Sequence, residues 1–330
     1  MKKIINNPEN VVNEMLEGIV KAYPEYVKRV EGFDVLVRAN LKEKVTLVSG
    51  GGSGHEPSHG GFVGEGMLDG AIAGEVFTSP TPDQVFEAIK AVDQGKGVLL
   101  VIKNYTGDVM NFEMAMELAD AEGIKVESVV VNDDVAVENS TYTTGRRGIA
   151  GTIFVHKIAG AAAEKGLKLD EVKRIAEKVI KNVRSMGMAL TPCTIPAVGK
   201  PGFELPEDEM EIGLGIHGEP GTHRDKIKNA REIVTHLMDK ILADIQINEN
   251  EEVVVLVNGL GGTPLMELYI ANNEVDKILK EKGIKTYKTI VGNYMTSIEM
   301  AGFSISILKL DDELKELLDE KADTPAFKQI

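Results

Sequence analysis

The chain has 330 residues, of which 43% are hydrophobic and 27% are charged, a composition typical of soluble globular proteins. Its net charge of −15 argues against a nucleic-acid partner, because phosphate backbones bind to clustered lysine and arginine. A single cysteine, Cys193, excludes an intrachain disulfide, and we interpret it as a small packed apolar residue. No apolar run reaches the roughly 20 residues that span a bilayer. We therefore expect a cytoplasmic protein without a membrane contact.

In the first half, predicted strands and helices alternate. The chain order is a helix over 11–20, strands over 35–37, 45–48 and 71–73, a helix over 82–93, a strand over 98–102, a helix through 112–118 and a strand over 125–131. This alternation predicts an α/β domain with a mostly parallel sheet flanked by helices. Ligands of such sheets bind at the carboxyl ends of the strands.

The second half is predicted to form a smaller α/β domain with a mixed sheet. Two helices over 149–165 and 170–188 precede a segment rich in proline and glycine, so we place the domains at 1–186 and 187–330. The elements that follow are a strand over 210–216, a helix ending near 243, a strand over 253–257, a helix ending near 282, and strands over 286–291 and 304–308.

The segment 49–61, SGGGSGHEPSHGG, follows the strand predicted over 45–48. Glycine is used where the backbone bends with positive φ or approaches a ligand closely, so this segment predicts a site. His55 and His59 also fit the zinc motif H-E-x-x-H, which requires a regular helix. Pro57 and the glycines that follow argue against that helix, and we expect no metal. Neither phosphate-binding glycine motif fits, so no nucleotide site is predicted.

Three further residues carry possible chemistry. Lys103 ends the strand predicted over 98–102, and Asp108 follows five residues later. Taken alone, the two side chains are as consistent with a surface ion pair, in which Asp108 also caps a helix, as with a functional site. His217 follows an apolar strand between two glycines, where a neutral imidazole can act as a nucleophile toward carbon, or can simply be a hydrogen-bonded turn residue.

Taken together, five strings resemble dihydroxyacetone kinases in both sequence and order. They are SGGGSGHEP at 49–57, FTSPTP at 77–82, IKNYTGD at 102–108, GRRG at 145–148 and GIHGEPG at 215–221. The chain is similar to the K subunit, the substrate-binding part of these enzymes, over essentially its whole length. The resemblance implies two α/β domains and a phosphotransferase that uses dihydroxyacetone.

The resemblance also implies a role for each site residue. His217 would add to the carbonyl carbon of dihydroxyacetone and form a hemiaminal, which a molecule without a carbonyl cannot do. His55 would hydrogen-bond the substrate and assist proton transfer, and Asp108 would be the general base for the attacking hydroxyl. Lys103 would bind the polar edge of the substrate, and the backbone of 52–54 (Gly52, Ser53 and Gly54) would approach it closely.

The partners follow from the same resemblance. The chain has no nucleotide motif and ends after a short polar tail, so we expect the separate K subunit of the phosphoenolpyruvate-dependent phosphotransferase system. ADP and Mg²⁺ would then be carried by an L subunit, which an M subunit recharges, and this chain would bind no cofactor itself. A homodimer is expected. The alternative is a regulatory relative that binds dihydroxyacetone and activates transcription without turnover.

Overall fold

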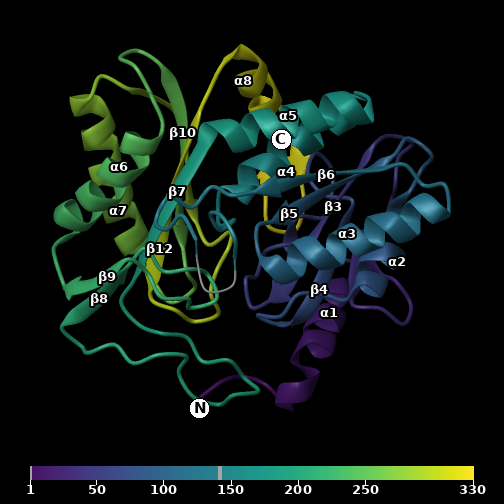
Figure 1. Cartoon of the computed structure of the whole chain (residues 1–330), viewed down its shortest axis with the longest axis horizontal. Coiled ribbons are helices and arrows are strands. Elements are labelled where there is room, and N and C mark those ends of the chain that lie inside the picture. Colours follow the sequence, from purple (N-terminus) through teal and green to yellow (C-terminus); the bar gives the residue numbers. More distant parts are fainter. Residues whose placement is uncertain (1, 140–142) are drawn as a thin grey trace.

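The computed structural model describes residues 2–139 and 143–330. These residues build two six-stranded sheets and a short two-stranded sheet, in the five-layer arrangement seen in Figure 1. The layers are a helix pair, the first sheet, a second helix pair, the second sheet and a third helix pair. The expected fold, two α/β units of which the second has a mixed sheet, is confirmed.

The first sheet has the strand order β1-β2-β4-β3-β5-β6. Its strands are β1 (Val27–Arg29), β2 (Val35–Arg38), β3 (Thr46–Ser53), β4 (Gly70–Val76), β5 (Val98–Lys103) and β6 (Val126–Val131). The pairs β4–β3, β3–β5 and β5–β6 are parallel, so the carboxyl ends of these four strands meet at one edge. Buried runs such as 98–102 are typical of parallel strands covered on both faces.

Helices cover both faces of this sheet. The helices α2 (Pro82–Val92) and α3 (Thr106–Ala121) pack on one face, and α4 (Thr152–Glu164) and α5 (Leu169–Asn182) pack on the other. The helix α1 (Val11–Ala22), preceded by the short helix η1 (Pro8–Asn10), contacts β1 and β4. Every residue of α4 except its last is buried, because this helix lies in the layer between the two sheets.

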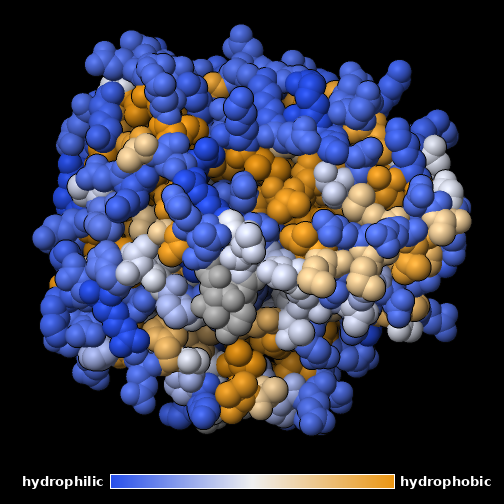
Figure 2. All heavy atoms as spheres, viewed as in Figure 1, coloured by the Kyte–Doolittle hydropathy of each residue, from blue (hydrophilic) through white to orange (hydrophobic). Residues whose placement is uncertain are grey.

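The second sheet has the order β11-β10-β12-β7-β8-β9 and one parallel pair, β10–β11. Its strands are β7 (Val183–Ala189), β8 (Glu209–Ile212), β9 (His223–Lys226), β10 (Glu252–Gly259), β11 (Lys285–Gly292) and β12 (Gly302–Lys309). The helices α6 (Ala230–Asp244) and α7 (Leu265–Glu281) pack on its outer face. Figure 2 shows hydrophilic residues around the rim of the viewed face and apolar residues between the two halves.

The chain ends on the first half of the molecule. The helix α8 (Asp312–Asp319) packs on α4, and a hairpin of β13 (Ala322–Asp323) and β14 (Lys328–Gln329) follows it. Asp323 pairs with Glu65, beside the helical turn η2 (Gly60–Phe62). The described residues contain no helix that is long and apolar enough to span a membrane.

Three expected elements were wrong. The helix predicted over 170–188 ends at Asn182, and β7 follows without a break, because its backbone pairs with β12 and β8 in the second sheet. The strand predicted over 210–216 ends at Ile212, where Gly213 turns the chain with a φ of +73°. The glycines 50–52 belong to β3 rather than to a loop after it. The domain boundary at 186/187 falls within β7 and stays a prediction.

Candidate active site

The strand β3, here called the glycine strand because it contains glycines 50–52, leaves room for a buried ion pair. Lys103 is the last residue of β5 and Asp108 lies in the first turn of α3, and their side chains approach to 3.3 Å, Nζ to Oδ2. A Cβ atom on Gly51 would lie 2.6 Å from that Nζ. The two residues are 0% and 2% exposed, so the interpretation as a surface ion pair is wrong. Removing two charges from water costs free energy, and buried charged groups of this kind cluster at functional sites. The pair is therefore a candidate functional element.

A carboxylate orients His217. The ring Nδ1 of His217 lies 2.9 Å from Oε1 of Glu219, and the backbone N–H of His217 donates to Oε2 at 2.9 Å. Burial opposes ionisation of Glu219, but the nearby His217 ring and the Arg147 guanidinium together lower its pKa to about 2. Because an ionised carboxylate only accepts hydrogen bonds, Nδ1 carries the proton. In the neutral form of the ring, the lone pair therefore lies on Nε2, the nitrogen that can act as a nucleophile.

Aromatic rings surround His217. The ring centroids of Tyr105, His55 and Phe77 lie 4.5, 4.7 and 5.3 Å from that of His217. The Lys103 ammonium lies 5.2 Å from the Tyr105 ring, which connects the ion pair to the imidazoles. The structure thus brings the four polar side chains singled out in the sequence into one contiguous cluster.

His55 is the second imidazole of the cluster and is fully buried. Its Nδ1 lies 2.8 Å from the carbonyl oxygen of Thr296, so Nδ1 carries the proton and Nε2 does not. Among the described residues, that Nε2 has no hydrogen-bond partner. Burial, and then the charges of His217 and Lys103, hold the pKa of His55 well below its usual range, which keeps the ring neutral.

Arg147 supports the turn that carries His217. Its guanidinium binds Asp134 at 2.7 Å and donates to the carbonyl oxygen of Gly213 at 2.7 Å. Gly215 passes between Arg147 and Glu219, where a Cβ would overlap the Glu219 carboxylate and lie 2.8 Å from Nη1 of Arg147. The guanidinium therefore holds the turn at Gly213 and adds positive charge near Glu219.

The remaining candidates of the glycine segment have structural contacts. The Ser53 hydroxyl donates to the carbonyl oxygen of Gly74 at 2.7 Å, so its proton faces the sheet. A Cβ on Gly52 would lie 2.6 Å from the backbone nitrogen of Thr78, and a Cβ on Gly54 would lie 2.8 Å from the Phe77 ring. Close packing thus accounts for these two glycines, and their contact with substrate stays a prediction.

The H-E-x-x-H segment is not a helix. Residues 54–59 form a bend and turns that end at η2, and His59 points away from His55 toward His156, with 3.0 Å between Nδ1 and Nε2. Within the described residues, no three His, Cys, Asp or Glu side chains form a group that could hold a metal ion. His59 has a different environment, described below.

Sequence reasoning missed several members of the cluster. Glu219, Tyr105 and Phe77 occur within the recognised strings but received no role. A glutamate two residues after His217 could have been predicted to hydrogen-bond its ring. Thr296 gave no signal, because it meets His55 only through the fold, 241 positions along the chain.

Comparisons with known proteins identify the family of the chain. A family model described as the Dak1 domain matches residues 17–326. The dihydroxyacetone-binding subunit DhaK of PTS-dependent dihydroxyacetone kinase 1 from Listeria innocua is 59% identical, over 95% of each chain. The corresponding subunit of the PEP-dependent kinase from Escherichia coli is 44% identical, over 99% of each chain.

Solved structures are similar over the same extent. The dihydroxyacetone kinase operon co-activator DhaQ superposes with a TM-score of 0.91 at 38% identity, covering 96% of this chain and 98% of that one. The dihydroxyacetone kinase of C. freundii gives a TM-score of 0.92 at 36% identity, covering 99% of this chain and 60% of that one. The expected family is confirmed: the chain belongs to the Dak1 domain family of the dihydroxyacetone kinases.

Proposed function

We propose that this chain is the substrate-binding subunit of a phosphoenolpyruvate-dependent dihydroxyacetone kinase. The observation that carries the proposal is the 2.9 Å contact of His217 Nδ1 with Glu219, which in the neutral ring leaves the Nε2 lone pair free, beside a second imidazole and a buried Lys103–Asp108 pair. An imidazole in this state is a nucleophile, and the carbonyl carbon of dihydroxyacetone is a matching electrophile.

The hemiaminal forms by addition to the carbonyl and then a proton transfer. The Nε2 lone pair of His217 bonds to the carbonyl carbon, and the C=O π electrons move to oxygen. Positive charge develops on the ring while the Glu219 carboxylate, 2.9 Å from Nδ1, stabilises it. Transfer of one proton from the ring to the new oxygen gives the neutral adduct. His55 Nε2 accepts a hydrogen bond from a substrate hydroxyl and serves this proton transfer.

Phosphoryl transfer needs a base and a partner. Asp108 accepts the proton of the terminal hydroxyl as that oxygen attacks phosphorus, and Lys103 binds the polar edge of the substrate. The donor is ADP-bound phosphate on a separate L subunit with Mg²⁺, recharged through an M subunit, so this chain positions the acceptor while its partner holds the donor. The proposal includes the expected homodimer and a cytoplasmic location.

Mass spectrometry and a coupled assay test the proposal. In native mass spectrometry, dihydroxyacetone should add its mass to the intact chain, and a His217→Ala variant should show no added mass. Purified chain, L subunit and phospho-donor should together yield dihydroxyacetone phosphate. An unmodified His217 in an active complex would refute the covalent step.

A second candidate is a dihydroxyacetone-binding regulator without turnover. The similarity to the co-activator DhaQ favours considering it, since that structure covers nearly the same length. The set of His55, Lys103 and Asp108 in one cluster supports the kinase subunit instead. Reconstitution with the L subunit separates the two: adduct formation without product would support the regulator.

A further inference from the structure

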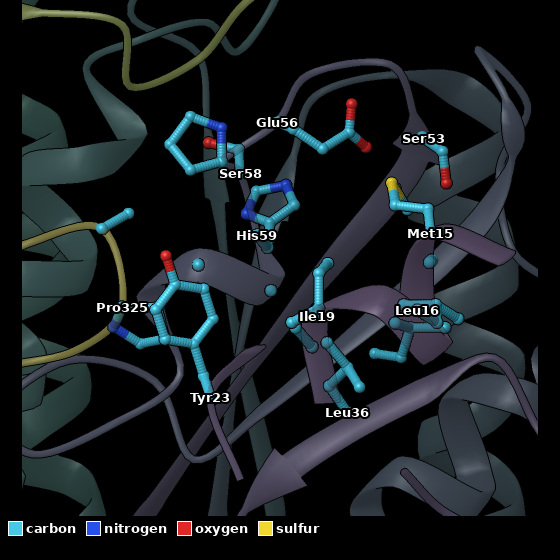
Figure 3. Close-up of a pocket in the computed structure, with 18 of the residues that line it drawn as sticks. Met15, Leu16, Ile19, Tyr23, Leu36, Ser53, Glu56, Ser58, His59 and Pro325 are labelled. Atoms are coloured by element: carbon cyan, nitrogen blue, oxygen red, sulfur yellow. The ribbon is translucent and has the colours of Figure 1, made fainter. Parts of the chain in front are cut away.

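A second cavity lies behind the glycine strand, between β3, β4 and α1. It has a volume of about 420 Å³ and apolar walls that include Leu16, Ile19, Tyr23, Leu36 and Ala73, with the C-terminal Ala326 at one side. Its described lining does not include His55, Lys103, Asp108 or His217. Figure 3 shows the His59 ring among these side chains, with Glu56 and Ser58 above it and Tyr23 and Ile19 below.

The His59 ring presents an acceptor to this cavity. The residue lines the cavity, is 5% exposed, and its Nε2 has no hydrogen-bond partner in the described part of the chain. Its Nδ1 lies 3.4 Å from the Ser49 hydroxyl and 3.0 Å from Nε2 of His156. Ser49 donates its only proton to the Val101 carbonyl at 2.7 Å, so it can only accept from His59. With the proton on Nδ1, where the Ser49 oxygen and His156 Nε2 can both accept it, Nε2 keeps a free lone pair.

Apart from the Tyr23 hydroxyl, which belongs to a side chain 38% exposed, the polar side chains of the cavity provide no donor for a ligand. The Ser53 and Ser58 hydroxyls donate to backbone carbonyl oxygens at 2.7 and 2.8 Å. The Glu56 carboxylate accepts from the backbone N–H of Gly54 at 3.0 and 3.1 Å and has no ion pair with a described residue. Burial raises the pKa of Glu56. A ligand that fits this wall is therefore an apolar molecule with a hydrogen-bond donor.

We propose that the cavity is a second ligand site, which binds a small neutral molecule with an apolar body and one hydroxyl group. The hydroxyl donates to Nε2 of His59, and the body contacts the apolar walls. The volume lies in the range of protein pockets that bind small organic ligands, and its few polar groups among apolar walls have the usual composition of such pockets. The site is separate from the cluster at His217 and does not rest on the function proposed for it.

A pair of probes tests the hydrogen bond. The probes are 2-naphthol and 2-methoxynaphthalene, which share an apolar body but differ in the donor. The chain contains no tryptophan, so the fluorescence of the probe can be followed directly in a titration. We expect 2-naphthol to bind about tenfold more tightly than its methyl ether, because the ether leaves His59 Nε2 unpaired. Equal affinities, or no 2-naphthol binding, would overturn the proposal.

Variants locate the probe. Ala73→Leu should fill the cavity and abolish binding, whereas Ala91→Leu, in the partly buried face of α2 away from the cavity, should leave binding unchanged. If Ala73→Leu does not fold, Ala326→Leu decides, since this residue lies at the half-exposed side of the cavity. His217→Ala should keep full 2-naphthol binding. Loss of binding in that variant would place the probe in the other cluster and refute a second site.

Discussion

Replacing Glu219 by glutamine tests the tautomer on which the proposed covalent chemistry depends. In the structure, the carboxylate accepts from both Nδ1 and the backbone N–H of His217. An amide of the same size keeps the packing but loses the charge, and its NH₂ end can donate to Nδ1. The ring can then carry its proton on Nε2, which removes the nucleophilic lone pair.

The substitution should change both the affinity for dihydroxyacetone and the folding stability. A hydrogen bond to a charged group contributes about 1.5–3 kcal/mol, so the apparent affinity for dihydroxyacetone should fall roughly 10- to 100-fold. A pKa of Glu219 lowered from 4.5 to about 2 corresponds to roughly 3 kcal/mol of folding stability. Because the folded-state pKa is the lower one, this contribution is present above pH 4.5 and is lost as the pH falls through about 2.

The affinity is measured by NMR with dihydroxyacetone labelled with ¹³C at the carbonyl carbon, which separates the trigonal carbonyl from the tetrahedral adduct. Urea unfolding at pH 7 and at pH 3 measures the stability, and the gap between the two proteins should narrow at the lower pH. Glu117→Gln, on the exposed side of α3, is the matched control. Undiminished adduct in Glu219→Gln would refute the assigned role of the carboxylate.

Three further changes address the neighbouring groups. Asp108→Asn should stop product formation with the L subunit while leaving the NMR adduct intact; normal turnover would exclude it as the base. Gly51→Ala places a Cβ 2.6 Å from the Lys103 ammonium, so urea unfolding should show a loss of about 1–3 kcal/mol, and turnover should fall. Arg147→Met leaves the buried Asp134 carboxylate unpaired and should cost roughly 3–5 kcal/mol at pH 7, and an unchanged unfolding midpoint would contradict this ion-pair argument.

The hydrophobic periodicity of the sequence predicted most elements of the fold. It failed where pairing with strands far along the chain determines the secondary structure. The apolar run at 98–102 and the helix from Pro82 could be predicted, because burial and capping residues lie within the segment itself. The first residues of β7 include Met186, which has good helix propensity, and no glycine or proline separates it from α5. Only the neighbouring strands of the second sheet make this segment a strand, and local sequence does not contain that information.

The sequence predicted which residues form the site but not their protonation states. Recognised strings identified His55, Lys103, Asp108 and His217. His55 and Lys103 lie at the carboxyl ends of β3 and β5, where ligands of an α/β fold bind, and the other two lie beside them. Their protonation states could not be predicted, since these depend on burial and on partners such as Thr296 that lie far along the chain.

The glycine strand is tied to the second half of the molecule by backbone contacts. The N–H groups of Thr296 and Ile298 donate to the carbonyl oxygens of His55 and Gly54 at 3.2 and 2.8 Å, and the His55 ring adds a third bond to Thr296. A hinge motion that parted the two halves would have to break all three. We therefore expect the proposed substrate to enter through local movement of side chains, and amide hydrogen exchange at Thr296 and Ile298 should stay slow throughout turnover.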